Sequence, residues 1–347
     1  MISNDQRIEA LSQLGFFIRE ELDKDKANQS TFLDELTRKA FIRNGWFDPR
    51  ETKSMLAYWA TELNTENLNR WISDYEFDSK RPYRVGLILA GNIPMVGFHD
   101  VIATIISGNI AVIKCSSNDD ILIPSLLNEL KRIEPGIVEQ IEIAVGILKN
   151  YDAILATGSN NSARHFNDYF GSVPNIIRKN RTGIAILNGD ETDEELNGLM
   201  LDCLKYFGLG CRSVTKLYLP KGYDINKIFT ASLPFAYLMD NKKYMNNYIY
   251  HKAVMVMEKK HVLENELILL LEEPSLFSPV SVLYYQFYET TAELNQIIEL
   301  NLDEIQCVLG HKNRPFGSGQ SPALSDYADG ANTLEFLRKL TLGQLSN

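Results

Sequence analysis

Short apolar runs and longer amphipathic segments alternate through the middle of the 347-residue chain. Residues 5–80 carry apolar positions at helical spacing with charged residues between them, which predicts a group of helices. Further along, short runs that are rich in β-branched residues or bounded by Gly and Pro predict buried strands. These runs are RVGLILA (84–90), IAVIK (110–114), VEQIEIAVG (138–146), DAILATG (152–158), GIAILNG (183–189) and SVTKLYLP (213–220).

Segments of helical length separate these predicted strands. They are PMVGFHDVIATIISG (94–108), ILIPSLLNELKRI (121–133), NSARHFNDYFG (161–171) and ETDEELNGLMLDCLKYFG (191–208). Pro94 is expected in the first turn of its helix, and Gly108 with Asn109 is expected to end that helix. Strand–helix–strand alternation predicts an α/β fold, in which parallel sheets carry helices on both faces. Residues 222–275 alternate less clearly, and the Gly-, Ser- and Pro-rich residues 312–336 are expected to be mostly loop.

Composition and charge exclude several classes of protein. The chain is 45% hydrophobic and 23% charged, which is typical of a globular protein of about two domains. Its net charge of -10 argues against nucleic acid as a partner, because phosphate binding needs a basic surface. No unbroken run of about 20 apolar residues occurs, so no membrane span is expected. The N-terminus lacks the apolar run of a signal peptide, and four cysteines without CxxC or zinc spacing favour a reducing, cytoplasmic compartment with no metal.

Polar residues follow the first two predicted strands, at the edge where ligands bind in open α/β sheets. In LILAGNIPMV, the Asn92 amide could donate to a developing oxyanion or could cap the next helix, and its position alone favours the cap. Lys114 ends the next strand, followed by Ser116 and Ser117. These residues could hold an anion or a ribose, although a lone lysine is more often part of a solvated loop.

Two further turns hold candidate residues. In LATGSNN, Gly158 and Ser159 stand between a strand and a helix, where small residues let the backbone approach a nucleotide, but the pattern is not GxGxxG. In LGCRSVTK, the cationic neighbours Arg212 and Lys216 could lower the pKa of the Cys211 thiol, as a nucleophile requires. The alternative is a buried structural cysteine, because free cysteines are among the most buried residues. That role suits Cys203 and Cys307, and Cys115 is ambiguous.

Taken in chain order, these segments resemble the aldehyde dehydrogenase superfamily. AGNIPMV resembles its oxyanion segment, with Asn92 as the amide, and SGNIAVIKCSS resembles its adenosine-ribose segment, with Lys114 as the basic residue. LGCRSVTKLYLP resembles its catalytic segment, with Cys211 as the nucleophile. LATGS resembles its turn beside the nicotinamide, and LFSPVSVLYY its later segment at the nicotinamide ribose. The resemblance runs from about residue 84 to the C-terminus and implies two Rossmann-like parallel-sheet domains with a small C-terminal bridging element.

The resemblance also implies a nicotinamide cofactor. Its binding residues would be Lys114, Ser116, Ser117, Thr157, Gly158, Ser159 and Phe277. Ser117 replaces an acidic residue of the superfamily that would repel a 2′-phosphate, and Ser275 replaces a glutamate that binds ribose. These two positions favour NADP and NADPH, with NAD left open.

One departure narrows the resemblance to the acyl-CoA reductase family, which includes the fatty-acid reductase subunit of bioluminescence. Ile177, in IIRKNRTGIAIL, stands where the superfamily has the glutamate that activates water for thioester hydrolysis. The resemblance therefore implies reduction of a fatty acyl-CoA to the aldehyde by NADPH, through an acyl group on Cys211. The aromatic- and Met-rich residues 234–257 suit an acyl chain but could equally be plain core.

Two other functions remain open at this point: an acyl-phosphate reductase of the same superfamily, and an inactive nucleotide-binding scaffold. The expected domains are residues 1–182, with the N-terminal helices and the cofactor-binding domain, and residues 183–318, with Cys211. Residues 319–347 are expected to form a C-terminal return and oligomerisation segment. The implied partners are acyl-CoA, further copies of the chain in a homo-oligomer, and an acyl-transferring or acyl-activating enzyme.

Overall fold

The structure, a computed structural model, describes residues 2–27, 29–77, 81–158, 160–310 and 312–345. Contacts divide the chain into two units. The first unit is Met1–Lys179 with Ala323–Asn347, and the second is Asn180–Pro322. The sequence instead predicted a boundary after residue 182 and a separate segment 319–347. The end of the chain groups with the first unit because Leu334, Leu337 and Leu340 of its last helix are buried in that unit's core.

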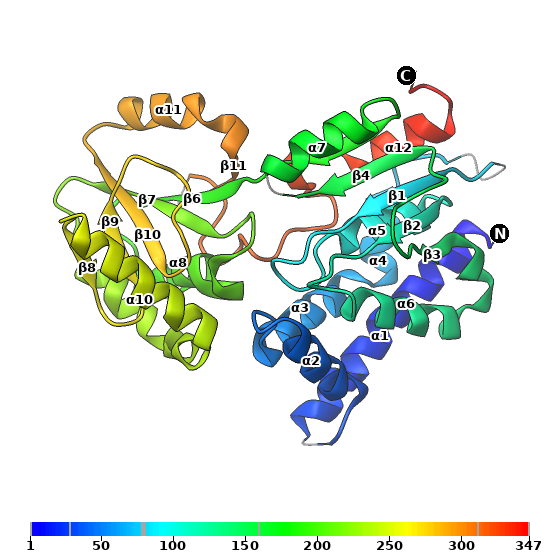
Figure 1. Ribbon diagram of the computed structural model, residues 1–347, viewed down its shortest axis with the longest axis horizontal. Helices are drawn as coiled ribbons and strands as arrows, with labels where there is room; N and C mark the ends of the chain where they lie inside the picture. The colour runs from blue at the N-terminus through cyan, green and yellow to red at the C-terminus, as the bar shows by residue number, and fades with distance from the viewer. Residues whose placement is uncertain (1, 28, 78–80, 159, 311, 346–347) are drawn as a thin grey trace. The chain divides into compact units, whose positions relative to one another are not determined.

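The first unit contains a five-stranded sheet with the order β3-β2-β1-β4-β5, and all of its strand pairs are parallel (Figure 1). Its strands are β1 (Arg84–Ile88), β2 (Ile110–Lys114), β3 (Ile141–Ile143), β4 (Ala153–Thr157) and β5 (Asn175–Arg178). Its helices are α1 (Asn4–Lys26), α2 (Phe32–Arg43), α3 (Pro49–Glu62), α4 (Thr65–Ile72), α5 (Phe98–Ile106), α6 (Leu122–Ile133), α7 (Asn160–Phe170) and α12 (Thr333–Thr341), with 3₁₀ turns at Pro135–Gln140 and Ala328–Gly330.

Alternation along the strands of this sheet builds a core on each face. Val85, Leu87 and Leu155 point to the side packed by α5 and α6. Ile154 and Ala156 point to the opposite side, which α7 covers. The predicted arrangement of a parallel sheet between helices is therefore confirmed for this unit.

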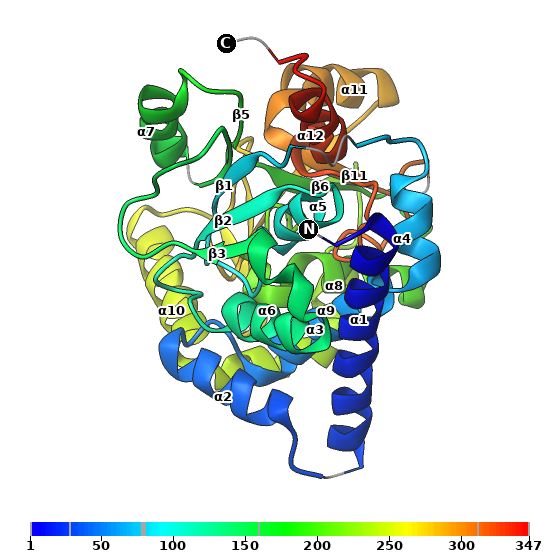
Figure 2. The same ribbon diagram turned by 90° about the vertical axis from the view of Figure 1, so that its right-hand side faces the viewer.

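The predicted N-terminal helices are confirmed as α1 to α4, and local capping explains where they begin. Ser3 and Thr31 each form a capping box at the start of α1 and α2, and Asp48 caps α3 ahead of Pro49. Figure 2 shows these helices gathered beside α5 and α6, and their apolar faces belong to the same core as the sheet. Burial of that shared face, rather than any one helix alone, stabilises the group.

The second unit contains a six-stranded sheet with the order β11-β6-β7-β10-β9-β8, in which only the edge strand β8 is antiparallel to its described neighbour. Its strands are β6 (Thr182–Ile186), β7 (Val214–Pro220), β8 (Val262–Glu264), β9 (Leu269–Glu272), β10 (Val282–Tyr288) and β11 (Ile305–Leu309). Its helices are α8 (Asp193–Leu204), α9 (Asn226–Ser232), α10 (Lys242–Met257) and α11 (Thr291–Leu300), with 3₁₀ turns at Lys205–Gly208, Leu233–Asp240 and Leu302–Glu304.

One predicted helix begins elsewhere, and five of the described strands were not predicted. The expected helix start at Pro94 is wrong, because Met95 (φ 61°) and Gly97 (φ 83°) adopt left-handed backbone and α5 begins only at Phe98. The end of α5 is as predicted, with Gly108 at φ 81°. The unpredicted strands are β5, β8, β9, β10 and β11. Of these, β5 and β11 are short and carry polar or basic residues among their apolar ones.

Candidate active site

Three loops of the first unit leave the carboxyl ends of neighbouring strands. The strands are β2, β1 and β4, and the order of the sheet reverses at β1, so the edge between β1 and β4 is a topological switch point. Ile88 pairs with Lys114 in the register of β1 and β2, and Leu89 N donates to Lys114 O at 3.1 Å. Candidate residues that are far apart in the sequence therefore share one edge of the sheet.

The loop after β1 carries Asn92, which is exposed. Asn92 does not cap α5, since the N-cap residue is Gly97 and no side chain caps that helix. The structure thus removes the reading of Asn92 that its position alone favoured. The backbone of this loop is held by Asp119, whose Oδ2 accepts a hydrogen bond from Met95 N at 2.8 Å.

The loop after β2 approaches the loop after β1 closely. A Cβ on Gly91 would lie 2.7 Å from Ser116 Oγ, so any larger residue there would require Ser116 to move. Lys114 and Ser116 are half-buried, and Ser117 is exposed. This arrangement leaves the side chains at the strand end accessible to a ligand.

The loop after β4 is equally tight. A Cβ on Gly158 would lie 2.8 Å from Ser162 Cβ and 2.9 Å from a ring carbon of Phe166, so glycine lets β4 run directly into α7. Thr157 is the half-buried last residue of β4. Ser159, the third residue predicted in this turn, lies outside the described residues.

These observations fit a dinucleotide. In α/β sheets such a ligand binds at a switch point, here the one at β1 and β4. It also uses tight glycine turns, where a Cβ would crowd neighbouring side chains, and a basic residue such as the one at the end of β2. The roles of individual residues in binding stay predictions.

In the second unit, Cys211 lies in a tight turn directly before β7. Ser213 N donates to Gly210 O at 3.0 Å, and Gly210 N donates to Ser213 Oγ at 3.1 Å, so Cys211 and Arg212 form the two central positions. Cys211 is half-buried. The tightness of the turn fixes the backbone on both sides of the thiol.

The backbone leading into this turn is strained. Tyr206, Phe207 and Gly208 have φ angles of 53°, 59° and 71°, and the first two are bulky residues for which left-handed backbone is unfavourable. Both aromatic side chains are only 2% exposed, so their burial holds this conformation. Backbone strain that the surrounding structure enforces is frequent at functional sites.

The other three cysteines suit structural roles. Burial raises the pKa of Cys115 and of Cys307 to about 11, and it raises that of Cys203 well above its ordinary value. A thiol with so high a pKa is a poor nucleophile at neutral pH. This comparison leaves Cys211 as the candidate among the four.

Phe277 lies in the segment before β10, the strand beside β7. Thr215 Oγ1 at the start of β7 donates to Leu276 O at 2.6 Å, which ties this segment to the strand that follows Cys211. Phe277 itself is half-buried and packs against the cluster that contains Tyr218. Cys211 and Phe277 thus lie in the segments that precede two paired strands, β7 and β10.

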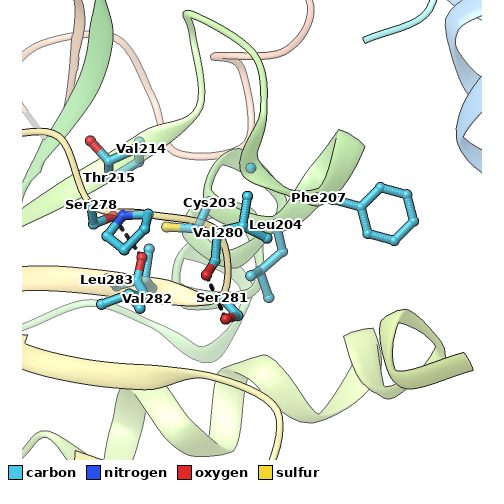
Figure 3. Close-up of a pocket in the computed structure, with 12 residues that line it drawn as sticks. Cys203, Leu204, Phe207, Val214, Thr215, Ser278, Val280, Ser281, Val282 and Leu283 are labelled. Carbon is cyan, nitrogen blue, oxygen red and sulfur yellow. Dashed lines mark hydrogen bonds between the residues drawn. The ribbon is translucent and has the colours of Figure 1, made fainter. Parts of the chain in front are cut away.

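A small pocket opens inside the second unit, between the end of α8 and the loop before β10 (Figure 3). Cys203, Thr215 and Ser278 are among its lining residues, and Ser278 Oγ donates to Val282 O at 2.6 Å. Its volume of about 20 Å³ suits a water molecule rather than an acyl chain.

Residues 234–257, in which the sequence left an acyl-chain site open, lie in the 3₁₀ turn Leu233–Asp240 and in α10. Part of this segment is core: Tyr244 is fully buried, and its hydroxyl donates to Leu267 O at 3.0 Å. Ile249 and Met257 are exposed on α10. The buried part of the segment is therefore plain core, the second of the two roles that the sequence left open.

Ile177, the residue at the missing glutamate, is half-buried in β5 and packs against the α7 side of the first sheet. Its basic neighbour Arg178 forms a buried ion pair with Asp100, so this guanidinium group is engaged within the protein. Burial works to raise the pKa of Asp100, but the charges and hydrogen bonds of Arg178 and His99 together outweigh it, and the pKa lies well below its usual range.

The described residues provide neither a cluster of metal ligands nor a membrane-spanning helix. No cluster of three or more His, Cys, Asp or Glu side chains is arranged to hold a metal ion within the described ranges. Within the same part of the chain, the helices are too short or too polar to cross a bilayer.

The fold is that of the aldehyde dehydrogenases. An aldehyde dehydrogenase of Brucella melitensis biovar abortus 2308 superposes with a TM-score of 0.65 at 11% identity, covering 89% of this chain and 72% of that chain. An NADP-dependent enzyme of E. coli gives 0.63 at 14% identity, covering 93% and 76%. Aldehyde dehydrogenase C of Pseudomonas syringae, a variant solved with NAD+ and octanal, gives 0.64 at 12% identity, covering 89% and 72%.

The family follows from the sequence. Residues 47–226 match the model of the acyl-CoA reductase (LuxC) family, and the chain belongs to that family. No curated protein matches the chain. Membership makes the protein an oxidoreductase of acyl or aldehyde groups, and the resemblance drawn from its motifs is confirmed.

Proposed function

We propose that the protein reduces a fatty acyl-CoA thioester to the aldehyde with NADPH, through an acyl group carried on Cys211. The observation that carries this proposal is Cys211 itself, held in a tight turn after a strained segment, in a chain of the acyl-CoA reductase family. A preorganised nucleophile of this kind is what covalent acyl transfer requires.

In the proposed reaction, the Cys211 thiolate attacks the thioester carbonyl and CoA leaves as its thiolate. The Asn92 amide donates to the oxyanion, and one such donor contributes about 3 kcal/mol to transition-state stabilisation. NADPH supplies the hydride that reduces the acyl thioester. Cys211 then leaves as the thiohemiacetal collapses, which releases the aldehyde.

The apolar residue at position 177 supports reduction over hydrolysis. Ile177 packs in β5 and has no group that could take a proton from water. An acyl-enzyme without such a base persists long enough for hydride to reach it. Lys114, Ser116, Ser117, Thr157, Gly158, Ser159 and Phe277 are the proposed cofactor residues.

The choice of NADPH rests on Ser117 and Ser275, and NADH is the alternative cofactor. The neighbours are divided, since one is described as NADP-dependent and another was solved with NAD+. The octanal in that second neighbour supports a medium-chain aldehyde as the product class. The four cysteines form no disulfide, which supports a cytoplasmic location. A homo-oligomer with an acyl-supplying partner enzyme completes the proposal.

The decisive variant is Cys211→Ala. We expect it to fold and to bind NADPH as the wild type does, but to lose turnover of acyl-CoA and thioester labelling by acyl-CoA. Cys203→Ala is the matched control, because that thiol is buried. Turnover by Cys211→Ala at the wild-type rate would refute the proposal, and rapid release of free acid by the wild type would refute the role given to Ile177.

A further inference from the structure

Ser213 closes the turn that carries Cys211 and is held by several groups at once. Besides its bonds with Gly210, Ser213 O accepts from Gly183 N at 2.9 Å and from Thr182 Oγ1 at 3.1 Å. Ser213 is fully buried. Gly183 is required for this approach, since a Cβ there would lie 2.7 Å from Arg212 O. The start of β6 thereby fixes the backbone of the turn.

A second contact reaches the same serine from a loop more than a hundred residues later. Gln320 Nε2 donates to Ser213 Oγ at 3.3 Å and to Asp202 O at 3.2 Å. Both N–H groups of the Gln320 amide thus have acceptors, and the residue is only 7% exposed. Ser213 Oγ accepts from both Gly210 N and Gln320, so the amide of Gln320 is bonded to the atom that closes the turn.

The loop that carries Gln320 is itself anchored. The Asp202 carboxylate, at the end of α8, accepts from Gly317 N at 2.5 Å and from Gly319 N at 2.8 Å. Burial raises the pKa of Asp202 to about 6, although these backbone donors favour the carboxylate. The backbone hydrogen bonds offset part of the cost of burying this carboxyl, and they fix the loop that carries Gln320.

We propose that Gln320 is a positioning residue for Cys211, acting through the Ser213 hydroxyl. The inference rests on the proposed function of Cys211 as the nucleophile. Loss of the Gln320 donor leaves two buried acceptors, Ser213 Oγ and Asp202 O, without this partner and releases one support of the turn. Displacement of a reacting atom by about 1 Å lowers a rate by about 100-fold, so a small release of the turn has a large effect.

The first test measures acyl-enzyme formation in a single turnover with acyl-CoA and no cofactor. Gln320→Met and Gln320→Glu both remove the donor, and each should slow this step at least tenfold while the KM for acyl-CoA changes less than twofold. Gln296→Met, at an exposed glutamine of α11, is the control and should match the wild type. Ser213→Ala should slow the step as well, and the double variant with Gln320→Met should be no slower than the worse single variant.

The second test needs no catalysis and measures amide hydrogen exchange in residues 209–214 of the full chain. We expect exchange at least tenfold faster in Gln320→Met, with α10 unchanged. Unchanged exchange would overturn the inference, and so would faster exchange with normal acyl-enzyme formation. If the wild type forms no acyl-enzyme, the proposed function fails, while exchange still decides whether Gln320 holds the turn.

Discussion

At the scale of single residues, the supports of the candidate groups are polar side chains far from them in sequence. Asp119 holds Met95 N in the Asn92 loop, and Gln320 reaches Ser213 across 107 positions. Each is buried, and each bonds to backbone or hydroxyl groups of the protein. Buried polar groups of this kind lower stability unless they are bonded, so their presence next to the candidate residues indicates that they keep local geometry.

Asp119 gives a pH-dependent prediction. Burial raises its pKa to about 7 from 3.8, against the lowering effect of the Met95 N–H. The folded state therefore binds this proton more tightly than the unfolded state, and the stability it confers is present below pH 4 and lost as pH rises to about 7. The loss is up to about 4 kcal/mol in the free energy of unfolding.

Urea unfolding at pH 5 and pH 8 checks this prediction. Asp119→Asn should remove most of the change between the two pH values, while Asp120→Asn, at the exposed neighbour, should leave it in place. Equal pH dependence in wild type and Asp119→Asn would contradict the assignment.

At the scale of elements, one buried ion pair joins three elements of the first unit. Arg178 of β5 pairs with Asp100 of α5, with Nη2 3.0 Å from Oδ1, and the same nitrogen donates to Thr333 Oγ1 of α12 at 2.9 Å. Both charged side chains are about 95% buried, at 5% and 6% exposure. The Thr333 contact adds a buried polar tie to the leucines of α12 that already hold the end of the chain in the first unit.

Breaking one side of this pair should be costly. Arg178→Met leaves the Asp100 carboxylate buried without its partner, and we expect the free energy of unfolding to fall by about 3–5 kcal/mol. Denaturant unfolding measures the change, with Arg164→Met on the exposed side of α7 as the control. The double variant Asp100→Leu with Arg178→Met should lose less than Arg178→Met alone, and a larger loss in the double variant would refute this account.

The strands and helices that the sequence predicted are those with a strong hydrophobic period or with clear start and stop residues at their ends. β2 matches IAVIK residue for residue, and α6 and α8 begin and end within a few residues of their patterns. The start of α5 could not be predicted, because left-handed backbone at a methionine, Met95, carries no sequence signal. The ion pair of Arg178 could not be predicted either, since nothing local to this residue indicates a partner 78 positions away.

At the scale of the whole molecule, the sequence predicted the fold and the order of the motifs but not the contacts that hold them. Motif order could be read because each candidate follows a strand end, which an apolar run marks. The hydrogen bonds that support the Cys211 turn could not be predicted from the sequence. Asp202 and Gln320 meet only because the loop after β11 returns to the end of α8. FGSGQSP signals a loop in sequence, and only the fold gives that loop an anchor.

Binding of the cofactor to the first unit should stabilise the folded protein. A ligand that binds the folded state at 100 times its Kd raises the free energy of unfolding by about 2.7 kcal/mol. NADPH should do so for the wild type and for Cys211→Ala, and should slow amide exchange in residues 89–97 and 115–121.

Two variants distinguish recognition of the 2′-phosphate from recognition of the parts that NADPH and NADH share. Lys114→Met should weaken NADPH and NADH alike, because it removes the basic residue at the end of β2. Ser117→Glu should weaken NADPH at least tenfold and leave NADH nearly unchanged, because a carboxylate there repels only the 2′-phosphate. Thermal unfolding with each cofactor measures both effects. If Ser117→Glu weakens the two cofactors equally, residue 117 does not face the 2′-phosphate, and the preference for NADPH loses its main support.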